Sequence, residues 1–221
     1  MADTRRFVSR AGDKLEHALE TFGVELEGRR CADFGCNVGG FTDCMLERGA
    51  TKVVAIDTGR GALAWKLRQD PRVEVLERTN ALHAPPPAEG VDLVTIDLAW
   101  TPQRLGVPAA LRWLAPGGRI VSLVKPHYEL EGEEKKLLQK GFLPQEHAPN
   151  ILEKVLQNMP NLGARVLEST TSPLVGGKTA RRRGVAGNLE YLALLEPLPT
   201  PGQNPGENPG ENPGNPEPGT G

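Results

Sequence analysis

The sequence has few cysteines, few aromatic residues and no long apolar run. Its 221 residues include three cysteines, two tyrosines, three tryptophans and five phenylalanines. Cys31, Cys36 and Cys44 lie close together without the spacing of metal ligands, and the four histidines are scattered, so neither disulfides nor a metal site is expected. No apolar stretch reaches the roughly 20 residues that span a bilayer, and no apolar leader core follows the N-terminal arginines. We therefore expect a cytoplasmic protein that does not enter a membrane.

A strong charge of either sign is also missing, since the formal net charge is -2. Three of the 28 acidic residues lie in residues 198–221, which contain no basic residue, so residues 1–197 carry 26 basic against 25 acidic residues. Net charge therefore does not indicate a nucleic-acid-binding protein, and any RNA-binding surface must be local. The sequence leaves the oligomeric state open.

Residues 198–221 differ in composition from the rest of the chain. They repeat a (Q/E)-N-P-G pattern and contain almost no apolar side chain to bury. Proline lacks the N–H group that regular structure requires, and such a composition cannot form a core. We predict a disordered tail over residues 198–221 and one globular domain over residues 1–197.

Short apolar runs alternate with segments of helical pattern through residues 1–197. This alternation is typical of βαβ units and predicts an α/β fold, with a mostly parallel sheet of seven strands and helices on both faces. The strands are predicted at residues 29–35, 52–59, 73–80, 91–100, 119–126, 163–170 and 188–197. The helices are predicted at residues 8–20, 41–50, 62–69 and 102–118, and over a stretch after residue 126 that Pro144 and Pro149 interrupt.

Polar residues stand at the carboxyl ends of five predicted strands. In parallel α/β sheets, ligands bind at this edge, near the point where the strand order reverses. We therefore expect these side chains to face one site. They are Asp33, Asp57, Thr79 with Asn80, Asp97 and Lys125.

The turn after Asp33 reads GCNVGGF over residues 35–41. Glycines allow a tight turn and a close approach to a ligand, and the following helix presents free N–H groups at its start. Asp57 follows at the next strand end, where a carboxylate can accept hydrogen bonds from both hydroxyls of a ribose. The pair resembles the S-adenosylmethionine loop of class I methyltransferases. A tight turn beside a strand-end aspartate is the alternative interpretation.

Two lysines and two acidic residues form a second candidate group. Asp97 and Lys125 end adjacent predicted strands, so their side chains can be neighbours. Glu190 lies in the final strand, and Lys14 lies in a helix that could cover the same edge. A lysine held by carboxylates can orient a hydroxyl and stabilise the alkoxide that develops from it. The alternative is a set of ordinary ion pairs, with Lys14 as a solvated helix lysine.

Segments carrying these residues resemble the catalytic domain of the hemolysin-A-type (TlyA) RNA 2′-O-ribose methyltransferases, within the FtsJ-like group. They include FVSRAGDKLEHALETFGV, the run from Gly39 to Asn80, VDLVTIDLAW, LAPGGRIVSLVKPHYE and GNLEYLALL. The family usually carries an N-terminal S4-type RNA-binding domain, and this chain begins a few residues before FVSR. We therefore expect a methyltransferase domain over residues 1–197 without the S4 domain.

The resemblance implies transfer of a methyl group from S-adenosylmethionine to a ribose 2′-OH of structured RNA, with rRNA as the expected substrate. It implies a catalytic tetrad at Lys14, Asp97, Lys125 and Glu190. The residues expected to bind the cofactor are Asp33, Gly35, Cys36, Asn37, Gly39, Gly40, Phe41, Asp57, Thr79, Asn80 and Asp97. Two other functions stay open: a degenerate methyltransferase-like protein that binds cofactor or RNA without catalysis, and a methyltransferase for a small hydroxylated molecule.

Basic residues precede two members of the tetrad in sequence. The candidate RNA-binding residues are Arg5, Arg6, Arg10, Lys178, Arg181, Arg182 and Arg183. Because these basic residues flank Lys14 and Glu190 in sequence, they could surround the catalytic site and contact RNA phosphates. A solvated loop without a ligand is the alternative. Trp65 and Trp100 could stack on the cofactor or a base, and for Trp65 we favour packing in the core.

Overall fold

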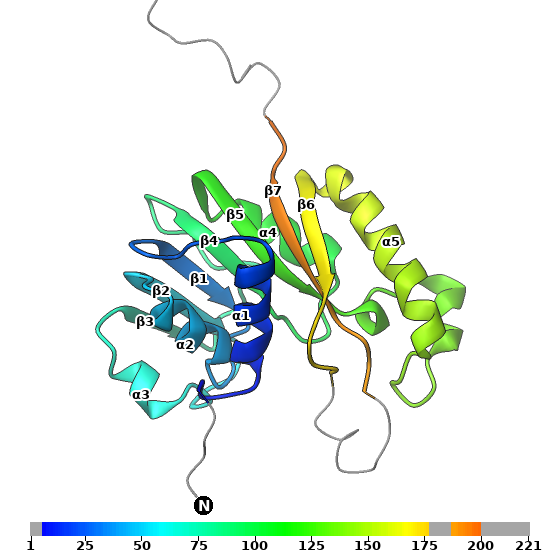
Figure 1. Ribbon diagram of the computed structural model, residues 1–221, viewed down its shortest axis with the longest axis horizontal. Helices are drawn as coiled ribbons and strands as arrows, with labels where there is room; N and C mark the ends of the chain where they lie inside the picture. Colours follow the sequence, from blue (N-terminus) through cyan, green and yellow to red (C-terminus); the bar gives the residue numbers. More distant parts are fainter. Residues whose placement is uncertain (1–5, 177–186, 200–221) are drawn as a thin grey trace, which may run out of the picture.

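Seven strands form one sheet in the order β3-β2-β1-β4-β5-β7-β6 (Figure 1). The structure is a computed structural model that describes residues 6–176 and 187–199. The strands are β1 Arg30–Phe34, β2 Lys52–Asp57, β3 Val73–Glu77, β4 Val91–Ile96, β5 Leu114–Val124, β6 Ala164–Thr171 and β7 Tyr191–Pro197. Strands β1 to β5 pair in parallel, whereas β7 runs antiparallel to both β5 and β6. The predicted, mostly parallel seven-stranded sheet is therefore confirmed.

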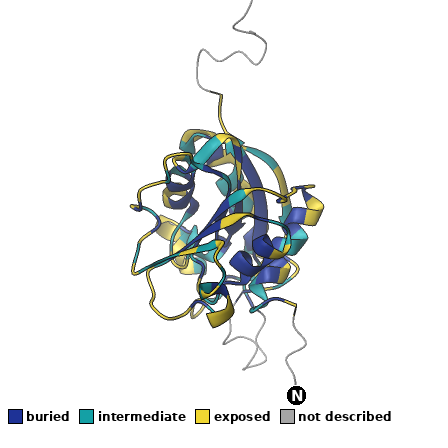
Figure 2. Cartoon of the chain, turned by 90° about the vertical axis from the view of Figure 1, so that its left-hand side faces the viewer, coloured by how far each residue is buried: buried dark blue, intermediate teal, exposed yellow. Residues whose placement is uncertain are grey.

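Helices cover both faces of this sheet, as predicted. They are α1 Ala11–Thr21, α2 Gly40–Glu47, α3 Trp65–Arg68, α4 Gln103–Leu111 and α5 Ala148–Asn158. Leu15, Leu19 and Met45 belong to a buried cluster under α1 and α2, and Val107 and Ile151 belong to a second cluster under α4 and α5. Figure 2 shows the buried strands between these layers, with exposed residues concentrated in the loops. The helix-period apolar residues of each helix thus face the sheet.

The helix predicted at residues 102–118 was wrong in its second half. Helix α4 ends at Leu111, and β5 already begins at Leu114, where Leu114 pairs with Val91 of β4. Gly117 has a φ of 78°, a left-handed conformation that glycine adopts readily, and the β4–β5 register shifts between Val91 and Leu93. The Pro-Gly-Gly sequence therefore bends a strand and does not end a helix.

The stretch after residue 126 also differs from the prediction. Three short 3-10 helices, Pro126–Tyr128, Gly132–Leu137 and Gln145–His147, replace its first part. Pro149 does not interrupt a helix, because it occupies the first turn of α5, where a missing N–H group leaves no hydrogen bond unmade. A fourth 3-10 helix, Met159–Leu162, follows α5.

The strand order brings the carboxyl ends of β1, β4 and β5 together with the start of β7. The chain builds the sheet from β1 outward to β2 and β3, then returns to place β4 on the other side of β1, so the strand order reverses between β1 and β4, beside the loop after β1. Val124 of β5 pairs with Tyr191 of β7, which places Glu190 beside Lys125 at the same edge. The predicted strand-end residues therefore share one edge of the sheet.

None of the described helices is long and apolar enough to cross a membrane. The predicted tail falls almost entirely on residues 200–221, which lie outside the described residues, so its disorder and the domain boundary at residue 197 stay predictions.

Glycines let the first turns of α1 and α2 approach each other closely. A Cβ atom on Gly40 would collide with Ser9 Oγ and lie 2.8 Å from the Gly12 nitrogen. A Cβ atom on Gly12 would in turn collide with the ring of Phe7, which is buried. This close contact sets the start of α1, and hence Lys14, above the glycine-rich loop.

We expect Gly40→Ala to lower the free energy of unfolding by roughly 1–3 kcal/mol, because the added methyl group must push α1 away from α2. Gly106→Ala is the matched control, since Gly106 also lies in a helix but its Cβ would sit 3.4 Å from Ile96 Cγ2, an ordinary contact. Urea unfolding of both variants measures the difference. Equal stability of the two variants would contradict the close-approach argument.

Candidate active site

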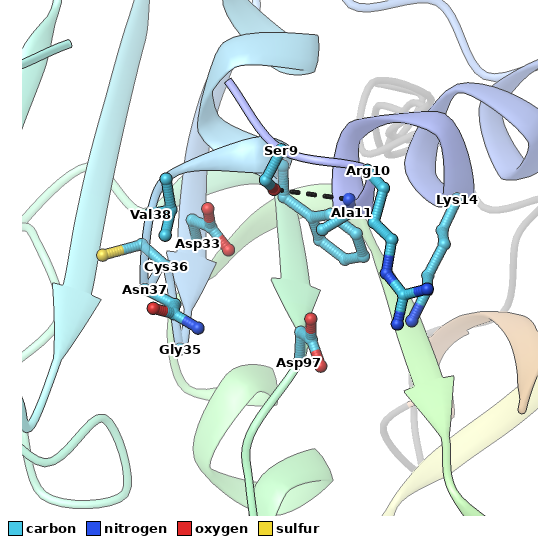
Figure 3. A pocket seen from close by; sticks show the side chains of 11 residues that line it. Ser9, Arg10, Ala11, Lys14, Asp33, Gly35, Cys36, Asn37, Val38 and Asp97 are labelled. Carbon is cyan, nitrogen blue, oxygen red and sulfur yellow. Dashed lines mark hydrogen bonds between the residues drawn. The ribbon is translucent and has the colours of Figure 1, made fainter. Parts of the chain in front are cut away.

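A pocket opens between the start of α1 and the loop after β1 (Figure 3). It encloses about 540 Å³, which includes open solvent at its mouth. Its lining residues are Ser9, Arg10, Ala11, Lys14, Asp33, Gly35, Cys36, Asn37, Val38, Phe41 and Asp97. The pocket thus combines most of the predicted cofactor loop with two predicted catalytic residues. Ser9, Ala11 and Val38 were missed, because small side chains carry no chemical signal in a sequence.

Backbone hydrogen bonds hold the glycine-rich loop in shape. The N–H groups of Gly35 and Cys36 both donate to the carbonyl of Ile56, over 2.9 and 3.0 Å. Gly35 has a φ of 91°, and a Cβ atom there would lie 2.7 Å from the carbonyl oxygen of Asp97. Gly39, with a φ of 99°, precedes the first residue of α2. Glycine is therefore required where the loop turns and where it passes β4.

Asp33 lies beneath the loop with no exposed surface. Its carboxylate accepts hydrogen bonds from the Thr42 N–H (3.0 Å), the Thr42 hydroxyl (2.7 Å) and the Thr95 hydroxyl (3.1 Å). Burial raises the pKa of Asp33 to about 6, although these hydrogen bonds favour the charged form. Asp33 therefore joins β1, α2 and β4 at the floor of the pocket and positions the loop.

Asp57 lies beside the loop, at the end of β2. Its carboxylate accepts hydrogen bonds from the N–H groups of Asn37 (2.8 Å) and Gly59 (2.7 Å). The N–H group of Thr79 donates to the backbone carbonyl of Asp57 over 3.0 Å, and Asn80 follows. Asp57, Thr79 and Asn80 do not line the pocket but extend its edge beyond Asn37, so their contact with a cofactor stays a prediction.

The four predicted catalytic residues form two ion pairs. Lys14 pairs with Glu190, and both side chains are buried. Lys125 pairs with Asp97 over 2.5 Å and also donates to the carbonyl of Leu98 over 3.0 Å. Lys14 and Asp97, one from each pair, line the same pocket. The interpretation of Lys14 as a solvated helix lysine is therefore wrong.

The loop after β4 and the turn after β5 contact each other beyond the Asp97–Lys125 pair. The rings of Trp100 and Tyr128 lie 4.9 Å apart, and the Lys125 ammonium lies 5.6 Å from the centre of the Tyr128 ring. Further along, the N–H group of Gln103 donates to both carboxylate oxygens of Glu129, over 3.0 and 3.1 Å. Glu129 thus caps α4 and was not identified from the sequence, because only the fold brings it to that helix end.

Trp65 contradicts its predicted place in the core, since 73% of its surface is exposed. Trp113, at 1% exposure, is the buried tryptophan and packs edge-on against Phe34. Helix α3 is only four residues long and buries Leu67, so Trp65 falls on its outer side.

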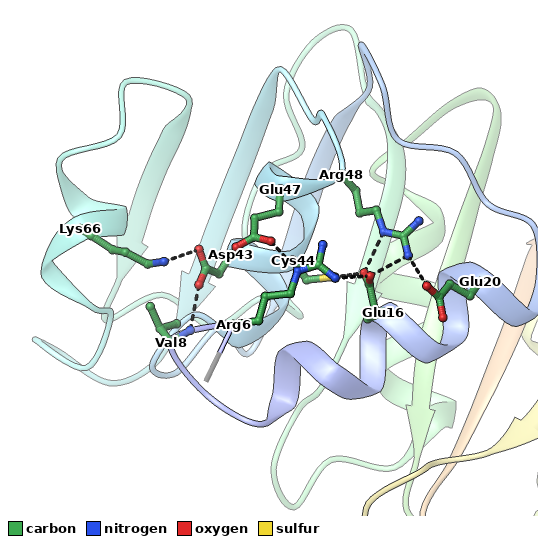
Figure 4. A network of polar contacts seen from close by, with 9 residues as sticks. All are labelled: Arg6, Val8, Glu16, Glu20, Asp43, Cys44, Glu47, Arg48 and Lys66. Atoms are coloured by element: carbon green, nitrogen blue, oxygen red, sulfur yellow. Dashed lines mark hydrogen bonds and ion pairs between the residues drawn. The ribbon is translucent and has the colours of Figure 1, made fainter. Parts of the chain in front are cut away.

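Among the candidate RNA-binding residues, Arg6 is engaged by two carboxylates (Figure 4). It pairs with Glu16 over 2.6 Å and with Glu47 over 2.7 Å, and therefore links α1 to α2. Arg48 binds Glu16 as well, and this contact lowers the pKa of Glu16 to about 2. The charge of Arg6 is matched within the chain, and its contact with phosphate stays a prediction.

Arg10 lines the pocket itself, beside Lys14. The remaining candidates lie outside the described residues, and their role stays a prediction; they are Arg5, Lys178, Arg181, Arg182 and Arg183. In the part of the chain that the structure describes, no three His, Cys, Asp or Glu side chains are grouped to hold a metal ion.

Comparison with known proteins identifies the family. The model of the FtsJ-like methyltransferases matches residues 7–187. The chain belongs to the FtsJ-like methyltransferase family. S-adenosylmethionine is accordingly its methyl donor, and the predicted class I methyltransferase fold and family resemblance are confirmed.

Curated relatives extend over most of the chain. The 16S/23S rRNA (cytidine-2′-O)-methyltransferase TlyA of Mycobacterium tuberculosis is 42% identical over 196 residues, which cover 86% of this chain and 69% of the relative. Hemolysin A of Brachyspira hyodysenteriae is 34% identical and covers 85% of this chain and 76% of the relative. A solved structure from Streptococcus thermophilus, described as a hemolysin, superposes with a TM-score of 0.80 at 36% identity, covering 91% of this chain and 70% of that one.

Glu129 makes stability depend on pH. Burial raises the pKa of its carboxyl from 4.5 to about 7, with Glu131 adding to the rise and Arg104 opposing it. Between these values the folded protein holds a proton that the unfolded chain has released. The stability contributed by Glu129 is therefore full below pH 4.5 and is lost as the pH rises through 7.

We expect Glu129→Gln to gain stability relative to the wild type between pH 5 and pH 8, because the neutral amide never carries a buried charge but still accepts the α4 hydrogen bond. Thermal unfolding midpoints at both pH values measure this change. Glu146→Gln is the control and should show no such trend, because Glu146 is exposed and is not among the groups that shift the pKa of Glu129. A pH-independent difference between Glu129→Gln and wild type would refute the assignment.

Proposed function

We propose that this chain transfers a methyl group from S-adenosylmethionine to a ribose 2′-OH of rRNA. The observation that carries the proposal is the position of Lys125, whose ammonium is held between the Asp97 carboxylate and the Leu98 carbonyl beside the cofactor loop. The names of relatives from Mycobacterium tuberculosis and Campylobacter jejuni, both rRNA (cytidine-2′-O)-methyltransferases, support the choice of RNA and of the ribose hydroxyl.

The residues around the pocket fit the cofactor. Gly35 brings backbone, without a side chain, to the pocket, and the half-buried Asp57 presents a carboxylate beside the loop, as a ribose requires. When bound, S-adenosylmethionine supplies an electrophilic methyl group on a positively charged sulfur. We propose that residues 35–41 cradle it and that Asp57 binds its ribose hydroxyls in place of the Asn37 and Gly59 amides.

Lys125 and Asp97 are proposed to act on the hydroxyl that receives the methyl group. A 2′-OH is a weak nucleophile until its proton begins to leave, and in this proposal the proton passes to water at the open mouth of the pocket as the oxygen bonds to the methyl group. The Lys125 ammonium can donate a hydrogen bond to that oxygen and stabilise the negative charge that develops on it. Asp97 and the Leu98 carbonyl fix the lysine, which restricts the positions of its remaining N–H groups. Asp97 and the Leu98 carbonyl thus orient the Lys125 ammonium before the reaction, which lowers the entropic part of the activation barrier.

Lys14 and Glu190 complete the proposed tetrad from the other side. Lys14 is 7% exposed and Glu190 is 5% exposed, so neither charge would be stable there without the other. Because Lys14 also lines the pocket, its ammonium adds positive charge near the oxygen that reacts. Glu190 positions Lys14 and links the start of β7 to α1.

We expect Lys125→Ala to reduce methyl transfer to rRNA at least about 100-fold, since one preorganised donor to a reacting oxygen contributes that much. Affinity for S-adenosylmethionine, measured by calorimetry, should change little. The assay uses labelled methyl donor and ribosomal subunits from a strain that lacks this protein, followed by nuclease digestion to nucleosides.

Lys136→Ala is the matched control, because Lys136 is 76% exposed and pairs only with Glu133, away from the pocket. Label in a 2′-O-methyl nucleoside supports the proposal. Full activity in Lys125→Ala would contradict the tetrad mechanism. Label found only in small molecules would favour a small-molecule methyltransferase. Cofactor binding without any methyl label in a product would favour a binding protein.

A further inference from the structure

Trp65 stands out because its large aromatic side chain is exposed at the same edge of the sheet as the pocket. It begins α3, in the segment that follows the carboxyl end of β2. Exposed large apolar residues are few in the described ranges: Trp65, Trp100, Leu105, Val175 and Leu198. Of these, only Trp65 lies in the β2–β3 region, so it is an isolated aromatic side chain and not part of an apolar patch.

The segment that carries Trp65 is firmly attached to the cofactor loop. The Ala64 N–H donates to the Val38 carbonyl over 3.0 Å, and the neighbouring Lys66 pairs with Asp43 of α2 over 2.9 Å. Leu67 is buried, and a Cβ atom on Gly39 would collide with it. The packing and hydrogen bonds of this segment therefore fix Trp65 in its exposed position. Its exposure is not the result of a loosely held surface loop.

Glu77 attaches the same segment to β3. Its carboxylate accepts a hydrogen bond from the Gly61 N–H over 2.7 Å and pairs with Arg68. The Arg68 guanidinium also donates to the Leu63 carbonyl over 3.1 Å. Glu77 is thus engaged by this chain, so the acidic charge at the end of β3 is already matched.

Arg60 and Arg78 lie at this edge as well. Both are exposed, and neither forms an ion pair with any residue in the ranges 6–176 and 187–199. The Arg78 N–H donates to the carbonyl of Gly59, next to Arg60, over 3.1 Å. Arg78 has a φ of 52°, a left-handed backbone that is uncommon for arginine. Two exposed arginines outside any ion pair in these ranges therefore lie on linked segments at the ends of β2 and β3, and Arg60, like Arg68, contributes to lowering the pKa of Glu77.

We propose that Arg60, Trp65 and Arg78 form an RNA-binding surface, here named the β2–β3 surface. It would take an unpaired segment of the same RNA whose ribose is methylated, and in this respect it rests on the proposed function. The strand order β3-β2-β1-β4-β5 places it on the opposite side of the cofactor loop from Lys125. The RNA would then cross the pocket, with contacts on both sides of the reacting nucleotide.

The chemistry of the three side chains favours RNA over a protein partner. Guanidinium groups bind phosphates, and an exposed aromatic ring stacks on an unpaired base. Tryptophan and arginine are also common at protein interfaces, but there the tryptophan lies within a well-packed centre, whereas Trp65 has no exposed large apolar neighbour in the β2–β3 region. The arginines and the tryptophan should contribute differently, because only the phosphate contacts displace counterions.

The test is the binding of purified rRNA to the full chain, measured as a function of salt concentration. We expect Arg60→Gln/Arg78→Gln to raise Kd about 10-fold at 0.1 M salt and to reduce the slope of log K against log salt by about 1.4, or about 0.7 per phosphate contact on a single strand. We expect Trp65→Leu to raise Kd about 5- to 10-fold with an unchanged slope, because stacking displaces no counterions.

Matched controls come from other surfaces of the chain. Arg119 is exposed within β5, away from the carboxyl edge, and Leu105 is 43% exposed on α4. Arg119→Gln and Leu105→Ala should leave Kd and slope unchanged. Unchanged unfolding temperatures in all variants would exclude misfolding as the cause of weaker binding.

Two results would overturn the β2–β3 surface. One is wild-type RNA affinity in both Arg60→Gln/Arg78→Gln and Trp65→Leu. The other is a loss of RNA affinity in these variants that is no larger than the loss in Arg119→Gln and Leu105→Ala. If Trp65→Leu alone binds RNA normally, a protein partner becomes the better explanation for that residue. These failures are distinct from failure of the proposed function, which would appear as a wild-type protein that puts no label into RNA.

Discussion

The buried carboxylate of Asp33 is the interaction on which the rest of the site depends. It accepts hydrogen bonds from Thr42 in α2 and from Thr95 in β4, and it does so with no exposed surface. A buried carboxylate is costly unless its hydrogen bonds are made, so the three segments must adopt the arrangement that provides them. This requirement positions the glycine-rich loop above it and the start of α2 behind it.

The second constraint is the edge at which the parallel strands end. Strands β4, β5 and β7 are adjacent, and their ends form a row that carries Asp97, Lys125 and Glu190. The register sets Lys125 level with Glu190, and it sets Asp97 level with Leu123, two residues before Lys125. Helix α1 crosses this row because glycines at positions 12 and 40 permit close approach, and it adds Lys14. Burial of two lysines and their acidic partners stabilises little by itself, but it allows few arrangements in which every charge is matched. The site is thereby ordered before any ligand binds.

Much of the site could be predicted from the sequence, but not all of it. The positions of Asp33, Asp97 and Lys125 follow from apolar runs that end in a polar residue, because parallel strands present their carboxyl ends together. All seven strands were predicted, but β4 ends four residues before its predicted end and β5 begins five residues before its predicted start. The helix after β4 was predicted too long, since a Pro-Gly-Gly sequence is compatible with a bent strand as well as with a helix end. Glu129 gave no local signal, because capping joins residues 26 positions apart in the chain.

The sequence by itself determined the alternation of strands and helices, the glycine-rich turn after β1 and the residue types at the strand ends, because these depend on local pattern and composition. Only the tertiary structure decided that Lys14 pairs with Glu190, that Arg6 is occupied by Glu16 and Glu47, and that Trp65 faces solvent. The two sets of ion pairs depend on which distant segments come into contact, and the exposure of Trp65 depends on the short length of α3. The free energy that settles such contacts comes from packing and charge pairing between segments, which no single stretch of sequence contains.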